Sequence, residues 1–186
     1  MPFKFEKTTI DGLTLIKPQI FKDERGYFLE TFKASDFGAR AMAMIFKQDN
    51  HSMSDKGVLR GLHFQLPPFD QGKLVYVVSG RVWDVTVDLR RGSSSFLKWH
   101  GDELSGENMR MLYIPPGFAH GFISLEDETH FLYKCTDEYS PDAERGIRYD
   151  DPRLGISWPS EEIHISEKDS QLPFYQDMEM ELQQGI

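Results

Sequence analysis

The sequence predicts an all-β fold, a jelly-roll barrel or sandwich that carries one or two short helices. Many short segments alternate apolar and polar residues with the period of a strand, and clusters of Gly, Pro, Asp and Ser separate them. Helical periodicity is confined to two short segments. Since no repeat, low-complexity tract or linker interrupts the pattern, residues 1–186 are expected to form a single domain.

The clearest strand signal is a predicted hairpin, in which Leu74–Val78 and Arg81–Leu89 flank the turn Ser79-Gly80. In its second arm, apolar side chains share one face and polar side chains take the other. The apolar set is Trp83, Val85, Val87 and Leu89, and the polar set is Asp84, Thr86 and Asp88. The remaining predicted strands are Thr14–Lys17, Phe28–Phe32, Phe46–Ser54, Val58–Gln65, Leu97–Leu104, Arg110–Ile114, Gly121–Leu125 and Thr129–Thr136.

The first predicted helix covers Ala34–Phe46, where apolar residues recur at four- and three-residue spacings. Ser35 or Asp36 lies near its expected start, as is typical of an N-terminal cap. Its apolar face would consist of Phe37, Ala41, Met44 and Ile45. A shorter, polar helix is predicted around Asp177–Gln183.

Length and composition are those of an ordinary folded domain. With 39% hydrophobic and 27% charged residues, the chain of 186 residues can bury a sizeable core and is not disordered. Its longest apolar run, Ala41–Phe46, falls far short of the roughly 18 residues of a membrane span, and residues 1–7 lack the apolar region of a signal peptide. The single cysteine, Cys135, excludes an intrachain disulfide framework and a cysteine-based zinc site. We therefore expect a soluble protein of a reducing compartment.

The charge balance narrows the range of partners. Lys and Arg total 21 against 30 Asp and Glu, which gives a net charge of −9 at neutral pH. Nucleic acids and anionic membranes are bound by basic surfaces, so neither is an expected partner. An anionic ligand would require the few cations to gather locally, because the chain has no Walker or Rossmann glycine loop. The candidate cations are Arg25, Arg60, Lys73 and Lys168.

The densest polar segment is Gln48–Ser54, which lies in one predicted strand and is followed by Gly57–Gln65, which contains the next. In a regular strand Gln48 and Asn50 point the same way, which makes either a paired hydrogen-bonding face or the solvated side of an edge strand. In the next strand Arg60 and His63 have opposite parity. They can line one pocket only if a bulge at Gly61 redirects one of the two side chains.

Two residues are candidates for acid and base chemistry. His63 has apolar neighbours, where a histidine is either a hydrogen-bonded core residue or a general base whose second ring nitrogen is oriented by an acceptor. Tyr133 has the parity of Phe131 and Cys135 and would face the interior with them. It is either a core tyrosine with its hydroxyl tied to the backbone or a general acid, since a phenol with a pKa of about 10 is protonated at neutral pH.

A third candidate, His120, follows a Pro-Gly turn within Ile114–Phe122 and resembles the second half of the cupin signature, where this histidine is a metal ligand. The first-half candidate, Gly61–Gln65, contains His63 but no second histidine two residues later. Two histidines without a third ligand make a weak metal site, so no catalytic metal is expected. A metal-dependent cupin oxygenase or isomerase that uses His63 and His120 remains an alternative.

Together these segments resemble the dTDP-4-dehydrorhamnose 3,5-epimerase family over nearly the whole chain, in one order and spacing. The matching segments are Asp23–Phe28 with Glu30, Gln48–Ser52, Val58–Gln65, Gln71–Val75, Asp84–Arg90, Pro115–Phe122, Tyr133–Pro141, Asp150–Pro152, Gly155–Pro159 and Ile165–Asp169. The resemblance implies a cofactor-free, cytoplasmic, homodimeric cupin-like jelly roll. Such an enzyme would invert C3 and C5 of a dTDP-4-keto-6-deoxyhexose to give dTDP-4-keto-L-rhamnose for surface polysaccharide synthesis.

The resemblance also implies roles for individual residues. His63 would be the general base with Asp169 as its orienting partner, and Tyr133 the general acid on the opposite face of the sugar. Lys73 would stabilise the enolate oxygen at C4. The positions that correspond to substrate contacts are Arg25, Glu30, Gln48, Asp49, Asn50, Arg60, Lys73, His120, Tyr139, Glu144 and Lys168. Of these, Arg25 and Glu30 are expected to reach across the dimer into the partner's site.

Two further alternatives stay open at this point. Relatives that invert only C3 or only C5 share most of these residues, so the number of carbons inverted is not decided. The segments Pro67–Asp70 and Asp142–Tyr149 vary within the family and do not decide it either. A non-catalytic carbohydrate-binding jelly roll would bind its ligand equally well without His63 and Tyr133.

Overall fold

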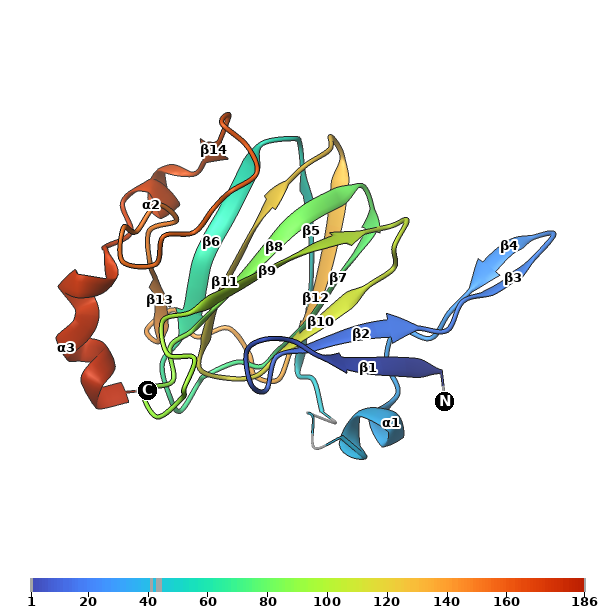
Figure 1. Ribbon diagram of the computed structural model, residues 1–186, viewed down its shortest axis with the longest axis horizontal. Helices are drawn as coiled ribbons and strands as arrows, with labels where there is room; N and C mark the ends of the chain where they lie inside the picture. Colours follow the sequence, from blue (N-terminus) through green and yellow to red (C-terminus); the bar gives the residue numbers. More distant parts are fainter. Residues whose placement is uncertain (1, 41, 43–44, 186) are drawn as a thin grey trace.

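Two β-sheets face each other in the computed structural model, which describes residues 2–40, 42 and 45–185 (Figure 1). Sheet 1 has the strand order β1-β2-β10-β7-β12-β5 and is antiparallel throughout. Its strands are β1 (Phe3–Lys7), β2 (Thr14–Pro18), β5 (Gln48–Ser54), β7 (Lys73–Ser79), β10 (Met111–Ile114) and β12 (Thr129–Cys135). Sheet 2 has the order β13-β6-β11-β8-β9, and the short strand β14 pairs in parallel with β6. Its strands are β6 (Val58–Gln65), β8 (Arg81–Asp88), β9 (Trp99–Ser105), β11 (Phe118–Ser124), β13 (Glu144–Gly146) and β14 (His164–Ile165).

Apolar side chains from both sheets meet in the space between them. Val75 and Val77 of sheet 1 pack with Val82 of sheet 2 in one buried cluster. Within the same cluster, the rings of Phe122 and Phe131 stack with their centroids 4.1 Å apart, one ring from each sheet. Burial of this area is the main favourable contribution to folding, and it holds the two sheets at a fixed separation.

Strand β8 is buried on both faces. Its predicted apolar face packs against helix α3 (Tyr175–Gly185) on the outside of sheet 2. Its polar face has the parity of Val82 and therefore points into the space between the sheets, where Asp84, Thr86 and Asp88 are each 0% exposed. The predicted alternation is confirmed, and it places polar groups inside the molecule.

The predicted hairpin of Leu74–Val78 with Arg81–Leu89 is wrong. Both segments are strands, but β7 pairs with β10 and β12 in sheet 1, whereas β8 pairs with β9 and β11 in sheet 2. Gly80, at φ +78°, lets the chain turn the corner between the sheets. A Ser-Gly turn between two alternating segments signals a reversal, and it does not say whether the strands pair or change sheets.

The other predicted strands are confirmed to within three residues at each end, except one. Phe28–Phe32 is wrong beyond its first residue, because the strands here are β3 (Phe21–Asp23) and β4 (Gly26–Phe28). These two form a hairpin that projects away from both sheets (Figure 1). Leu29 and Phe32 follow as a loop that packs on the outer side of sheet 1.

Helix α1 (Ala34–Gly38) covers only the first part of the predicted helix Ala34–Phe46. Phe37 is buried as predicted, but no side chain caps the first turn, and Ile45 is 72% exposed and not helical. Ala41 and Met44 lie outside the described residues. The predicted helix at Asp177–Gln183 is confirmed as part of α3, and a third, unpredicted helix is α2 (Glu167–Ser170). None of the helices in the described part of the chain is long and apolar enough to cross a membrane.

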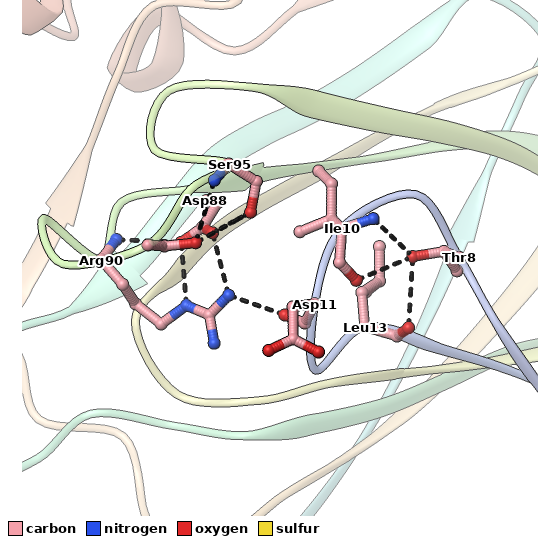
Figure 2. A network of polar contacts seen from close by, with 8 residues as sticks. Thr8, Ile10, Asp11, Leu13, Asp88, Arg90 and Ser95 are labelled. Atoms are coloured by element: carbon pink, nitrogen blue, oxygen red, sulfur yellow. Dashed lines mark hydrogen bonds and ion pairs between the residues drawn. The ribbon is translucent and has the colours of Figure 1, made fainter.

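A polar network joins the turn between β1 and β2 to the end of β8 (Figure 2). Asp88 accepts hydrogen bonds from Arg90 Nε at 2.9 Å, Arg90 Nη2 at 2.8 Å and Ser95 Oγ at 2.6 Å. Arg90 Nη2 also donates to the Asp11 carbonyl at 2.7 Å. Burial raises the pKa of the Asp88 carboxyl, but the hydrogen bonds from Arg90 and the two nearby serines outweigh it, so the pKa lies below its ordinary value.

Asp88→Asn should lower the free energy of unfolding by about 2 to 3 kcal/mol at neutral pH, because it removes the charge that these donors bond. The folded-state pKa is lower than that of the unfolded chain, near 3.9. The contribution is therefore fully present above that value and is lost as the pH falls through the folded-state pKa.

Urea unfolding of both proteins between neutral and acidic pH measures this, and the gap should close on acidification. Asp150→Asn, which breaks the exposed pair with Arg148 at 2.7 Å, is the matched control and should cost less than about 1 kcal/mol. A gap that is absent or independent of pH would contradict the role given to Asp88.

Candidate active site

Two adjoining cavities open between the sheets, and three side chains line both of them. The cavities have volumes of about 130 and 280 Å³. The shared residues are His63 on β6 of sheet 2, Lys73 on β7 and Tyr133 on β12 of sheet 1. The imidazole therefore comes from one sheet, and the ammonium and phenol come from the sheet that faces it.

A carboxylate orients the imidazole of His63. His63 Nε2 lies 2.8 Å from Asp169 Oδ1, and the backbone N–H of Gly61 donates to Asp169 Oδ2 at 3.1 Å. Burial raises the pKa of Asp169, but the hydrogen bonds from His63 and Gly61 outweigh it, so the pKa is lowered and the carboxyl is ionised at neutral pH. An ionised carboxylate only accepts, so Nε2 carries the proton and Nδ1 is the basic nitrogen.

A bulge in β6 brings Arg60 and His63 to the same cavity. His120 on β11 pairs with His63 on β6, and Phe122 on β11 pairs with Arg60 on β6. Two residues along β11 therefore correspond to three residues along β6, so β6 has one extra residue. Gly61 has φ +124°, and a Cβ there would lie 2.6 Å from the Cα atom of Gly121 on the paired strand β11. The condition that the sequence set for a shared pocket, a bulge at Gly61, is therefore met, and both side chains line the larger cavity.

Tyr133 faces the interior, as its parity predicts. Its hydroxyl makes no hydrogen bond to any described residue, so it is not the backbone-tied core tyrosine that the sequence left open. Burial raises the pKa of the phenol, and the nearby thiol of Cys135 acts in the same direction. The group is therefore protonated at neutral pH and free to donate.

Lys73 lies beside this phenol, with Nζ 5.9 Å from the centre of the Tyr133 ring. Its ammonium makes no ion pair or hydrogen bond within residues 2–40, 42 and 45–185. Burial lowers the pKa of Lys73, and the surrounding groups Cys135, Asp84 and Glu144 oppose that shift. An unpaired donor in this position is available to an oxygen that gains negative charge.

His120 is held by a second carboxylate. Its Nε2 lies 2.8 Å from Asp84 Oδ2, and the residue is 7% exposed. His120 and His63 stand directly opposite each other on neighbouring strands, each bonded to its own aspartate. Among the described residues, no three His, Cys, Asp or Glu side chains are grouped to hold a metal ion, so the donors do not make up the cupin ligand set.

Polar side chains from three segments border the smaller cavity. Gln48 Nε2 donates to Asn50 Oδ1 at 2.9 Å, so the predicted paired face exists, and Gln48 Oε1 accepts from the backbone N–H of Tyr139 at 2.7 Å. Glu144 Oε2 accepts from the Tyr139 hydroxyl at 2.8 Å and from Lys168 Nζ at 2.6 Å. These residues form a rim rich in donors and acceptors.

Four predicted contact residues line neither cavity within one copy of the chain, and of these Lys168 bonds a lining residue, Glu144. Asp49 lies on the opposite face of β5, is 71% exposed and pairs with Lys134 at 2.9 Å. Arg25 sits at the turn of the projecting hairpin, 83% exposed and bonded to Asp23. Glu30 follows the same hairpin and lines neither cavity.

A model of the dTDP-4-dehydrorhamnose 3,5-epimerase family matches residues 7–177. The chain belongs to this family. The dTDP-4-dehydrorhamnose 3,5-epimerase of Methanothermobacter thermautotrophicus is 51% identical over 90% of this chain and 91% of its own length.

Solved structures of the family have the same fold, which confirms the predicted cupin-like jelly roll. The dTDP-6-deoxy-D-glucose-3,5-epimerase of Legionella pneumophila, in complex with dTDP-4-keto-L-rhamnose, is 47% identical with a TM-score of 0.93. That match covers 97% of this chain and 96% of the other. A 3'-monoepimerase from Streptomyces bikiniensis, in complex with dTDP-quinovose, is 31% identical with a TM-score of 0.83, covering 95% and 96%.

Sequence reasoning missed one residue that organises the mouth of this epimerase-family site. Gln65, only 6% exposed, donates to the carbonyls of Phe69 at 2.6 Å and Glu138 at 3.2 Å. Its Oε1 accepts from the backbone N–H of Ser140 at 2.8 Å, so one side chain ties two loops together. Its parity with His63 on the same strand was the signal that could have found it.

Asp169→Asn should reverse the tautomer of His63. Asp169 accepts from two donors, and the Gly61 N–H cannot change its role. The single amide oxygen of asparagine must therefore face Gly61, which turns the NH₂ group toward Nε2 and makes that nitrogen an acceptor.

Nitrogen-15 NMR of the His63 ring distinguishes the two forms. Nε2 should resonate as a protonated nitrogen in the wild type and as an unprotonated one in Asp169→Asn. Asp137→Asn, which removes an exposed carboxylate paired with Lys47 at 2.8 Å, should leave the wild-type pattern. The same pattern in all three proteins would refute the assignment of Nδ1 as the base.

Proposed function

We propose that this chain inverts C3 and C5 of dTDP-4-dehydro-6-deoxy-D-glucose and so makes dTDP-4-dehydro-L-rhamnose for dTDP-L-rhamnose and surface polysaccharide synthesis. The observation that carries the proposal is that His63 and Tyr133, from opposite sheets, both line the two adjoining cavities. Family membership supports the same reaction. We propose that the chain acts without a metal or redox cofactor, because the chemistry below needs only a base, an acid and a cation.

The first step is removal of a proton from a carbon beside the C4 ketone. Such a C–H bond is acidic because the resulting charge moves onto the ketone oxygen. His63 Nδ1 takes the proton, and the imidazolium that forms is stabilised by ionised Asp169. A positioned base of this kind contributes about 10² to 10⁴ in rate.

The second step returns a proton to the opposite face of the same carbon. Tyr133 is protonated at neutral pH and belongs to the sheet that faces His63. Between the two steps Lys73 stabilises the enolate oxygen, an effect of about 10² to 10³ for one well-placed donor. Because the oxygen is shared, the same base, acid and cation can serve C3 and then C5.

The sugar nucleotide needs polar contacts and positive charge outside the reacting centre. Arg60 and His120 line the larger cavity beside His63, where they would border the sugar and the diphosphate. The rim formed by Gln48, Asn50, Tyr139, Glu144 and Lys168 offers donors and acceptors to the nucleotide. Local cations of this kind would let a chain of net charge −9 bind a dianionic diphosphate.

A cytoplasmic homodimer would complete the site. The hairpin β3–β4 exposes Tyr27 and Phe28, which are 57% and 65% exposed, and carries Arg25 at its turn. Apolar side chains on a projecting hairpin favour contact with a second copy of the chain. Through that contact Arg25, with Glu30 behind it, would enter the site of the partner subunit.

The alternatives are weighed by specific residues. Inversion of one carbon only uses the same base and acid, and the 3'-monoepimerase named above shares the fold at 31% identity. A metal-dependent reaction at His63 and His120 is disfavoured because no third His, Cys, Asp or Glu of the described residues joins them in a group that could hold a metal ion. A carbohydrate-binding module would have no use for an oriented imidazole opposite an unbonded phenol.

Deuterium incorporation from D₂O into dTDP-4-dehydro-6-deoxyglucose, resolved by carbon with NMR, tests the reaction. The wild type should label both C3 and C5, and His63→Ala should abolish labelling at both carbons. Tyr133→Phe should reduce net inversion by about 10² or more while retaining some exchange, because the base alone can return a deuteron to the original face.

The outcomes separate the alternatives. Labelling at one carbon only would identify a monoepimerase, and no labelling by folded wild type would refute the proposal. Equal loss of exchange and inversion in Tyr133→Phe would mean that the tyrosine positions substrate and does not donate a proton. His164→Gln removes an exposed histidine and should behave as wild type.

Mixed dimers test the shared site. Arg25→Ala and His63→Ala should each be inactive alone, because each would lack one component of every site. After subunits are exchanged, half of the dimers are mixed and each mixed dimer has one intact site, so about a quarter of wild-type activity should return. No recovery in dimers shown to have exchanged subunits would place Arg25 in its own subunit's site.

A further inference from the structure

Four polar residues form a straight row across the inner face of sheet 2. His63 on β6 pairs with His120 on β11, His120 pairs with Thr86 on β8, and Thr86 pairs with His100 on β9. Residues directly opposite each other in antiparallel strands have their side chains on the same face, about 4.5 to 5.5 Å apart at Cβ. The row therefore leads from the candidate base to β9, which is the edge strand of the sheet.

Three buried polar atoms along this row have no hydrogen-bond partner among the described residues. They are Asp84 Oδ1, Thr86 Oγ1 and His100 Nε2. Asp84 bonds His120 through its other oxygen, and both Asp84 and Thr86 are 0% exposed. Such atoms are costly to bury unpaired, and ordered water is the usual partner of buried polar atoms that have none in the protein.

We propose that ordered water joins Asp84, Thr86 and His100 into a proton path from His63 and His120 to the solvent at the edge of sheet 2. At the outer end, Asp102 lies beside His100 on β9 and bonds Arg110 at 3.1 Å. Their side chains are 17% and 37% exposed, so the path reaches bulk water there. Burial lowers the pKa of His100, and the neutral imidazole both accepts and donates a proton.

The path rests on the proposed double inversion and explains how it can occur in one binding event. After the first inversion His63 holds an extra proton and Tyr133 has lost one. Before the second carbon reacts, one proton must leave His63 for solvent and one must reach Tyr133, while the sugar nucleotide covers the front of the cavities. The row provides a route behind the substrate for the first of these protons, which leaves His63 for solvent.

Crystallography of the wild type at high resolution tests the hydration directly and does not depend on activity. Ordered water should lie within hydrogen-bond distance of Asp84 Oδ1, Thr86 Oγ1 and His100 Nε2. A dry interior at these three atoms would overturn the proposal whatever the protein catalyses.

Product partition in single-turnover reactions tests the transport. Thr86→Val and His100→Leu should each raise the released fraction of singly inverted sugar by roughly tenfold. This effect is smaller than the loss of about 10² in rate that follows removal of a direct acid or base. Thr86→Ser, which restores the hydroxyl, should return the wild-type partition, and the exposed His164→Gln should not change it. A merely structural role for these residues would lower melting temperature and overall rate without altering the partition.

The result is decisive in each direction. If the wild type inverts two carbons and the product partition is unchanged in both Thr86→Val and His100→Leu, the proton path is overturned. The proposed function is then still supported. Wild type that incorporates no deuterium would instead refute the proposed function, and the crystallographic result alone would then decide whether the row is hydrated.

Discussion

The hydrogen bond between His63 and Asp169 joins residues that are 106 positions apart, and much of the C-terminal third of the chain serves to form it. Strands β13 and β14 both pair with β6, the strand that carries His63. The short helix α2 then places Asp169 against β6, with the Ser166 hydroxyl accepting the Asp169 N–H at 3.0 Å. Helix α3 continues over the outer face of sheet 2 (Figure 1). The packing that covers the sheet thus also orients the base, so loss of this segment would remove both.

The space between the sheets is divided into an apolar part and a polar part. Phe122 and Phe131 belong to the buried cluster and also line the larger cavity, so their stacked rings form the boundary. On the polar side, two imidazoles, two carboxylates and an ammonium lie in an environment where water is scarce and electrostatic effects are stronger than in bulk solvent. Polar groups in this position cost stability, and their retention is typical of a functional site.

Local pattern was sufficient for most of the strands and for the orientation of the site residues. Parity along β12 predicted that Tyr133 faces inward, and parity along β5 predicted that Gln48 and Asn50 point the same way. The parity conflict of Arg60 and His63 identified a bulge at Gly61 as the condition for a shared pocket. The pairing of strands was not accessible in this way, because which sheet a strand joins depends on contacts distant in sequence. The hairpin error at Gly80 arises there.

The site residues implied by family resemblance fall into two groups, those that one chain brings together and those that it does not. Those on the strands around the cavities are brought together, including Lys73, His120 and Glu144. Asp49 faces away and Arg25 projects from the molecule, and no periodicity within one chain could reveal a contact that requires a second copy. The position of His100 in the row could not be predicted from the sequence, because it depends on the register between β8 and β9.

The central claim is that a proton leaves one face of the sugar ring and arrives on the other. A crystal structure with a bound dTDP-sugar that lacks the C4 ketone tests it most directly. We expect His63 Nδ1 and the Tyr133 hydroxyl on opposite faces of the ring, with Lys73 Nζ at about 3 Å from the oxygen on C4. Both groups on the same face, or a sugar bound out of reach of either, would contradict it.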